Sequence, residues 1–92
     1  MRAEAKARAS LTPPPADMQH ANVRAVFGTY EDLMQQALRT IATLRECGEQ
    51  NYADALAQDA MAIARRGRVH MRNLAARARR EAAANHNGEH AA

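Results

Sequence analysis

The residues with the clearest potential for chemistry are seven arginines between positions 65 and 80. This stretch of sixteen residues contains no Asp or Glu. A guanidinium group is planar and permanently charged, and its paired donors match the oxygens of carboxylates and phosphates. The arginine-rich segment, as we name residues 65–80, is therefore suited to an anionic partner.

The basic charge of the chain is concentrated in its last third. Residues 1–64 contain six Lys or Arg and eight Asp or Glu, a net charge of −2. Residues 65–92 contain seven Arg and two Glu, a net charge of +5, and the two parts add to the +3 of the whole chain. Arginine outnumbers lysine twelve to one, so an alternative reading is that arginine only solvates the surface.

The arginines gather on one face if the segment is helical. With an advance of about 100° per residue, Arg65, Arg68, Arg72 and Arg79 fall together. Two apolar residues, Met61 and Val69, lie on or near the same face, and both Arg and Met are enriched at protein interfaces. The candidate partner-binding residues are therefore Arg65, Arg68, Arg72, Arg77, Arg79, Arg80, Met61 and Val69.

Other chemistry is poorly supported. His20 and His70 would lie about 13 Å apart along two paired helices, too far to share one metal ion. Cys47 has no histidine nearby in sequence to activate it as a nucleophile. The four glycines are isolated, so no glycine-rich phosphate loop is present. We therefore predict no enzymatic activity, no metal and no cofactor.

The elements that must position the arginines are helices. The chain contains 23 Ala and three aromatic residues, and Ala is the best helix former but buries little area. Within Cys47-Gly48-Glu49-Gln50-Asn51, Gly48 suits the left-handed position after a helix, and Asn51 can cap the next one. A connection this short predicts an all-α, antiparallel, coiled-coil-like two-helix hairpin.

Each predicted helix has one apolar stripe. The first helix spans residues 16–47 and the second spans residues 52–84, with the apolar residues of the second at spacings close to a heptad. The stripe of the first helix keeps its phase across Gly28. The alternative is a break near Gly28, with Thr29 capping a new helix, which would give three helices.

Three regions follow from these boundaries. Pro13, Pro14 and Pro15 end any upstream helix because proline lacks a backbone donor and restricts the preceding residue. We predict a flexible N-terminal arm over residues 1–15, a helical hairpin domain over residues 16–84 and a disordered tail over residues 85–92.

Two long helices side by side do not enclose a core, so the hairpin needs a partner. We predict a homodimer that forms a four-helix bundle. The alternative is a monomer closed by its own N-terminal arm. The candidate residues of the oligomer interface are Leu33, Met34, Leu38 and Ile41.

The turn also fixes which residues face each other. Residues paired across the hairpin should have numbers that add to about 99. Glu31 and Asp32 would then lie near residues 65–68 and could offset their charge. Residues 72–80 would face residues 19–27, which contain no acid.

These patterns favour a small, non-enzymatic helical binding protein that acts as a regulator, inhibitor or adaptor. We expect a protein or nucleoprotein partner on the arginine-rich helix face. The alternative is direct binding of DNA or RNA by the second helix. The chain has a single cysteine and no apolar stretch of membrane-spanning length, so we expect a cytoplasmic protein that does not enter a membrane.

Overall fold

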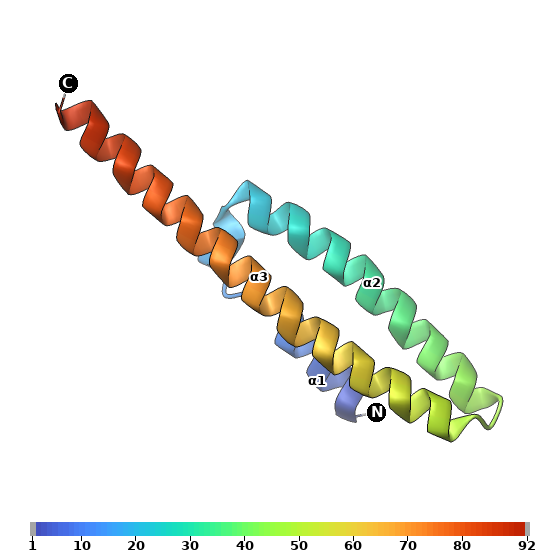
Figure 1. The fold of residues 1–92 in the computed structure, drawn as a ribbon. Coiled ribbons are helices and arrows are strands. Elements are labelled where there is room, and N and C mark those ends of the chain that lie inside the picture. Colours follow the sequence, from blue (N-terminus) through green and yellow to red (C-terminus); the bar gives the residue numbers. More distant parts are fainter. Residues whose placement is uncertain (1, 92) are drawn as a thin grey trace.

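A computed structural model describes the backbone of residues 2–91 and the side chains of residues 5–85. The chain forms helix α1 (Arg2–Leu11), the 3₁₀ turn η1 (Asp17–Gln19), helix α2 (Ala21–Glu46) and helix α3 (Gln50–Ala91). Residues 2–91 contain no strand, which confirms the all-α class. The two long helices pack antiparallel, and the molecule is a rod of 66 × 16 × 15 Å (Figure 1).

The turn between α2 and α3 is the predicted stop at Gly48. Gly48 has a φ of +78°, in the left-handed region that a Cβ disfavours. Its amide donates to the carbonyl of Arg45 at 3.1 Å, and the amide of Glu49 donates to the carbonyl of Leu44 at 2.8 Å. These two bonds form a Schellman motif, which satisfies carbonyls at the end of α2.

The start of α3 differs from the predicted cap at Asn51. The helix begins at Gln50, and the carbonyl of Glu49 accepts the amide of Ala53 at 3.0 Å, so Asn51 already lies in the first turn. Arg45 reaches across the turn, with Nη1 2.8 Å from Gln50 Oε1 and 3.1 Å from Asp54 Oδ1. This side chain joins the two helix ends directly.

Helix α2 is continuous through Gly28, so the predicted alternative of a break there is wrong. The hydroxyl of Thr29 donates to the carbonyl of Val26 at 2.7 Å, inside the helix, and caps nothing. The helix starts at Ala21, later than expected, because His20 has an extended ψ of 128°. The third helix of the fold is α1, not a product of a break in α2.

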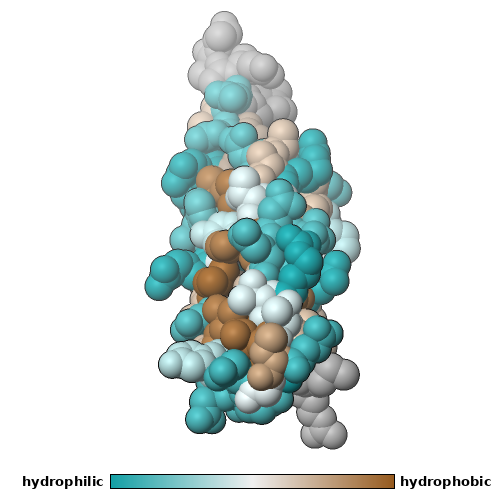
Figure 2. Space-filling view, turned by 90° about the vertical axis from the view of Figure 1, so that its right-hand side faces the viewer, coloured by the Kyte–Doolittle hydropathy of each residue, from teal (hydrophilic) through white to brown (hydrophobic). Residues whose placement is uncertain are grey.

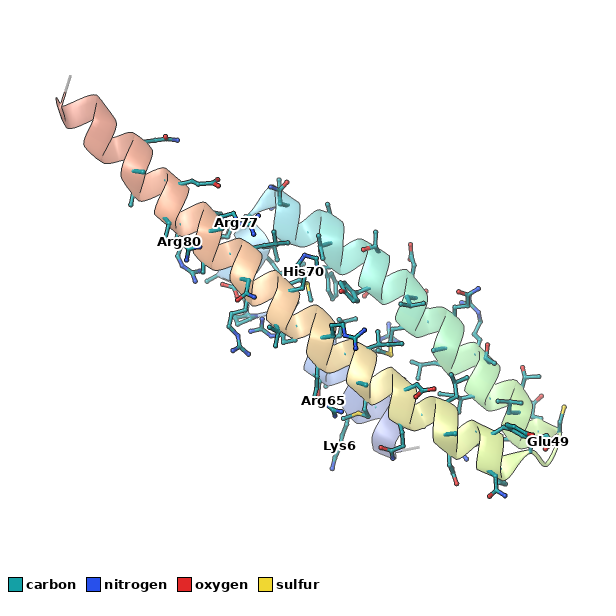
Figure 3. The ribbon with its side chains drawn as sticks, in the orientation of Figure 1. Lys6, Glu49, Arg65, His70, Arg77 and Arg80 are labelled. Atoms are coloured by element: carbon teal, nitrogen blue, oxygen red, sulfur yellow. The ribbon has the colours of Figure 1, made fainter. Side chains whose placement is uncertain are left out.

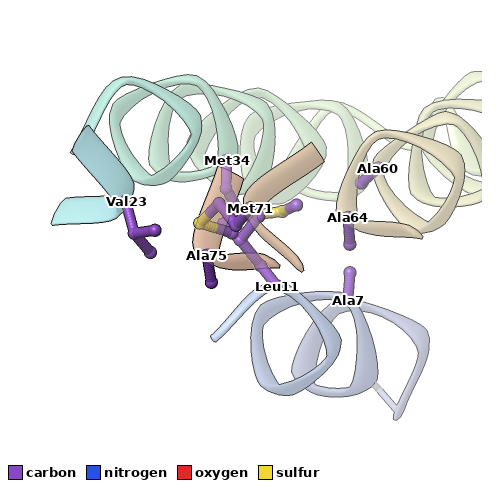
Figure 4. Packing of buried hydrophobic residues seen from close by; sticks show 8 residues of the cluster. All are labelled: Ala7, Leu11, Val23, Met34, Ala60, Ala64, Met71 and Ala75. Atoms are coloured by element: carbon purple, nitrogen blue, oxygen red, sulfur yellow. The ribbon is translucent and has the colours of Figure 1, made fainter. Parts of the chain in front are cut away.

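Helix α1 occupies the region for which the sequence predicts a flexible arm. It packs against both α2 and α3. Its contact residues are Ala7 and Leu11, four positions apart and both almost fully buried. They lie against small residues of α3, and Figure 4 shows Ala7 directed towards Ala64. Because only these two residues of α1 make the contact, and the rest of the helix is charged or Ala-rich, the sequence shows no apolar stripe here.

Gly67 of α3 lies next to side chains of both α1 and α2. A Cβ on Gly67 would lie 2.8 Å from Cδ1 of Tyr30 in α2 and 2.9 Å from Cδ1 of Leu11 in α1. Both distances are shorter than the 3.5–4.0 Å of ordinary carbon contacts. A Cβ at position 67 would therefore force the Tyr30 and Leu11 side chains to move, whereas a Cβ on Gly28 would meet nothing within 4 Å.

The core is a narrow seam of small residues and methionines. Ala60, Ala64, Met71 and Ala75 of α3 line it, opposite Val23 and Met34 of α2. A second cluster near the turn joins Ile41 to Ala53 and Ala57. The alanines let the helix backbones approach closely, which compensates for the scarcity of large apolar side chains.

Helix α3 continues to Ala91, through the segment predicted as a disordered tail. It projects past the start of α2 (Figure 1). The side chains of residues 86–92 lie outside the described part of the chain. Among the described residues, no helix is both long and apolar enough to span a membrane.

Candidate binding surface on helix α3

The pairing of α2 with α3 follows the predicted register. The hydroxyl of Tyr30 lies 3.4 Å from Nδ1 of His70, and the two rings meet edge to face with centroids 6.0 Å apart. Nearer the turn, Arg45 forms an ion pair with Asp54 at 3.1 Å. The residue numbers of these pairs add to 100 and 99, which confirms the expected value of about 99.

The arginines occupy two sides of α3. With an advance of about 100° per residue, Arg65, Arg68, Arg72 and Arg79 share the side next to η1, while Arg66 and Arg77 flank the other side. Figure 3 shows Arg65 beside α1, and Arg77 and Arg80 further along α3. The predicted face is therefore a single row of four arginines, with the others placed around the helix.

Asp17 contacts two arginines of this row, a role that the sequence patterns did not predict. The residue is 7% exposed. Its Oδ1 accepts from Nη1 of Arg79 at 3.2 Å, and its Oδ2 lies 3.8 Å from Nη1 of Arg68. The expectation that the distal arginines face no acid is therefore wrong for Arg79. Asp17 lies two positions before residues 19–27, the range expected to face residues 72–80. The η1 turn brings its carboxylate next to Arg79.

Arg79 forms a hydrogen bond with Asp17, but Arg68 does not. Its Nη1 is buried and makes no hydrogen bond within the described residues, because 3.8 Å is too long for one. Its attraction to Asp17 is therefore electrostatic. Arg68 and Arg79 together place two positive charges beside the one carboxylate of Asp17, so the three side chains have a net charge of +1.

The remaining arginines of the segment are exposed. Within residues 5–85 they form no ion pair, and neither Glu31 nor Asp32 reaches them, although both acids were expected nearby. We call this set the unpaired arginines: Arg65, Arg66, Arg72, Arg77 and Arg80.

The two apolar candidates on this surface differ in accessibility. Val69 is 47% exposed and offers apolar area beside the arginines. Met61 is half-buried and packs against the main core cluster. Val69 is therefore the more accessible of the two for an external partner.

The four candidates for an oligomer interface are used mainly inside the single chain. Met34 and Ile41 are each 2% exposed and belong to the two core clusters. Leu38 packs between these clusters, and only Leu33 stays 45% exposed. Ile41 is buried by the pairing of α2 with α3, and Met34 shares its cluster with Ala7 and Leu11 of α1 as well.

A shallow groove lies where α2 meets the His70 region of α3. It has a volume of about 420 Å³ and is wide open to solvent. The groove is lined by Val26, Thr29, Tyr30, Leu33 and His70.

The described residues contain no group of three or more His, Cys, Asp or Glu side chains that could hold a metal ion. Cys47 is exposed at the turn. No known protein family, no curated protein and no solved structure matches this chain.

Proposed function

We propose that this protein is a small non-enzymatic binding module, a regulator, inhibitor or adaptor that holds an acidic partner on the arginine-rich segment of α3. The observation that carries the proposal is the set of five unpaired arginines on one helix. An unpaired guanidinium keeps all its donors available for carboxylate or phosphate oxygens.

The structure provides a rigid platform for these arginines. The Met71 and Ala75 positions of α3 are fully buried, which anchors the helix between the exposed side chains of Arg72 and Arg77. Arg72 and Arg80 are eight residues apart, a separation of about 12 Å along the helix. A partner would therefore meet a fixed array of charges, so less entropy is lost on binding.

A protein or nucleoprotein partner suits this surface better than bare single-stranded nucleic acid. Exposed Val69 adds apolar contact area beside the arginines, as at protein interfaces. Phe, Tyr and Trp, on which unpaired bases commonly stack, are not found among residues 65–85.

Direct binding of DNA or RNA is the second candidate, and one observation favours it. Helix α3 projects past the start of α2, so its last turns are not covered by the hairpin (Figure 1). An α-helix of this kind fits the major groove of a duplex, and arginines bind its phosphates.

Capture from a lysate of the native host with the purified protein as bait tests the proposal. The informative variant is Arg72→Ala/Arg77→Ala/Arg80→Ala, which keeps the Asp17 contacts of Arg68 and Arg79. The matched control is Lys6→Ala/Arg8→Ala/Arg39→Ala, which removes three exposed positive charges from α1 and α2. Both variants lower the net charge from +3 to 0.

The proposal predicts a protein partner that is recovered by the natural chain and by the control and is lost with the α3 variant. Recovery by all three would contradict the arginine surface. A parallel titration with short duplex DNA and with single-stranded RNA at low salt decides the second candidate. Affinity that falls steeply with added salt supports it, and no binding at low salt eliminates it.

A further inference from the structure

Helix α1 and the η1 turn form one segment, residues 2–19, that packs on α3; we call it the strap. The amides of Asp17 and Met18 donate to the carbonyl of Pro14 at 3.0 and 3.3 Å, so these bonds lie within the strap. Among the described residues, no backbone hydrogen bond joins the strap to α3. The strap can therefore leave α3 by breaking side-chain contacts alone.

Asp17 of the strap places a carboxylate on the row of four arginines of α3. It lies 3.8 Å from Nη1 of Arg68 and 3.2 Å from Nη1 of Arg79. The other two members of the row, Arg65 and Arg72, form no ion pair within the described side chains. From Arg65 to Arg79 the row is about 21 Å long at 1.5 Å per residue. Two of its four arginines are thus held by the same chemical group that an acidic protein would offer.

We propose that the strap is an autoinhibitory segment. Asp17 holds Arg68 and Arg79 in the free protein, and an acidic protein segment with several carboxylates displaces the strap to bind the whole row. This inference rests on the proposed function and adds its regulation. A single carboxylate would replace only the Asp17 contact, whereas several carboxylates on one chain can offset the lost packing of the strap as well.

The environment of Arg68 gives such a partner a reason to prefer the open state. With the strap in place, Nη1 of Arg68 is buried and makes no hydrogen bond within the described residues. A partner's carboxylate that approaches to about 2.8 Å would accept a charge-assisted hydrogen bond from this donor. A ligand shifts a conformational equilibrium only if it binds one state better than the other, and this bond forms only when Asp17 is replaced.

The strap has few apolar contacts to hold it closed. Ala7 and Leu11 are buried, and Met18 is half-buried against the main core cluster. Chain ends with few buried contacts open at a lower free energy than the whole fold. At the other end of the strap, Nη1 of Arg24 donates to the carbonyls of Met18 and Gln19 at 2.9 and 2.8 Å. Arg24 therefore ties the strap to α2, so that the strap stays close to α3 and closes again when the partner leaves.

Calorimetric titration with polyglutamate at low salt tests the proposal on Asp17→Asn and on a matched control, Asp32→Asn. Both variants raise the net charge from +3 to +4, but Asp32 is exposed and forms no ion pair within residues 5–85. A binding-competent state populated at about 10% or less weakens the apparent affinity by that fraction, so Asp17→Asn should bind roughly ten-fold more tightly than the natural chain. Asp32→Asn should stay within about two-fold of it.

The probe and a second variant separate displacement of the strap from other effects. Polyglutamate has no large apolar side chain, so its binding does not depend on the line of hydrophobic side chains that Figure 2 shows on one side of the molecule. Leu11→Ala loosens the strap without a change of charge and should tighten binding roughly three-fold or more. An affinity of Leu11→Ala no higher than that of the natural chain would contradict displacement.

Hydrogen exchange of the natural chain measures the movement of the strap directly. Saturation with polyglutamate should speed exchange of the α1 amides, while the amides of α3 around Met71 and Ala75, which are fully buried, stay protected. Unchanged or slower exchange in α1 would show that polyglutamate binds with the strap closed, and the inference would then be wrong.

The outcomes distinguish the strap from the proposed function. Equal affinity of the natural chain, Asp17→Asn and Asp32→Asn would overturn the strap alone if Arg72→Ala/Arg77→Ala/Arg80→Ala still binds more weakly. Equal affinity of that triple variant as well would contradict the proposed function too. No binding of polyglutamate by Asp17→Asn would overturn the strap, because the freed row would not hold carboxylates. Tighter binding of Asp17→Asn to duplex RNA, and not to polyglutamate, would overturn the assignment to an acidic protein.

Discussion

Replacement of Gly67 by Ala should destabilise the protein, although the same replacement at Gly28 should stabilise it. Both glycines lie inside long helices, where Ala is favoured over Gly by about 1 kcal/mol. At Gly67 the new Cβ would lie 2.8 Å from Cδ1 of Tyr30, 2.9 Å from Cδ1 of Leu11 and 3.0 Å from Cε1 of Tyr30. At Gly28 it would meet nothing within 4 Å.

The size of the destabilisation follows from the overlap between the new Cβ and the Tyr30 ring. The Tyr30 ring must retreat by roughly 0.7 Å or more to reach an ordinary carbon contact, and its hydroxyl contact with His70 opposes that movement. Overpacking of this kind costs about 1–3 kcal/mol. After the gain in helix propensity, Gly67→Ala should lose about 0–2 kcal/mol of unfolding free energy, and Gly28→Ala should gain about 1 kcal/mol.

Urea unfolding followed by circular dichroism measures both variants, and Gly28→Ala is the matched control for helix propensity. In a Leu11→Ala background the penalty of Gly67→Ala should shrink, because one of the two overlapping side chains is shortened. Equal stability of Gly67→Ala and Gly28→Ala would show that the three helices do not meet at Gly67.

Three further stability changes are expected from the same unfolding assay. Gly48→Ala should lower the unfolding free energy by about 1–2 kcal/mol, because Gly48 has a φ of +78°; an unchanged midpoint would contradict the Schellman turn. Asp17→Asn should lower the unfolding free energy by about 1–2 kcal/mol, because it leaves the buried Nη1 of Arg68 without a negative neighbour; the exposed Arg79 adds little to this loss. An unchanged unfolding free energy would show that Asp17 does not stabilise the fold through these arginines. Leu11→Ala should cost about 2–4 kcal/mol, because Leu11 is 1% exposed; a negligible loss would mean that α1 is not held on the hairpin.

The hairpin and its register were predictable because they depend on local chemistry and on periodic stripes. Gly48 marks the turn by its own conformational freedom, and the antiparallel pairing then follows from the length of the connection. The Arg45–Asp54 pair and the Tyr30–His70 contact lie where this register requires. The arginine-rich segment was also predictable, because it is defined by the residue types at positions 65–80.

The third helix and the role of Asp17 were not predictable from local patterns. Helix α1 is held through Ala7 and Leu11 against small residues of α3, and neither residue forms a stripe by itself. Asp17 is buried only because the η1 turn returns the chain to α3. Both features depend on contacts between segments about fifty or more residues apart. Leu11 of α1 belongs to the core cluster of Met34, whereas Ile41 is buried against Ala53 and Ala57 of α3.

The claim that the arginine-rich segment binds an acidic partner is tested most directly by calorimetric titration of the captured partner with three proteins. These are the natural chain, Arg72→Ala/Arg77→Ala/Arg80→Ala and Lys6→Ala/Arg8→Ala/Arg39→Ala. At about 1 kcal/mol for each lost charge-assisted contact, the α3 variant should bind roughly one hundred-fold more weakly. The control should stay close to the natural affinity. Equal weakening of the two variants would show that net charge, and not the arginine surface of α3, determines binding.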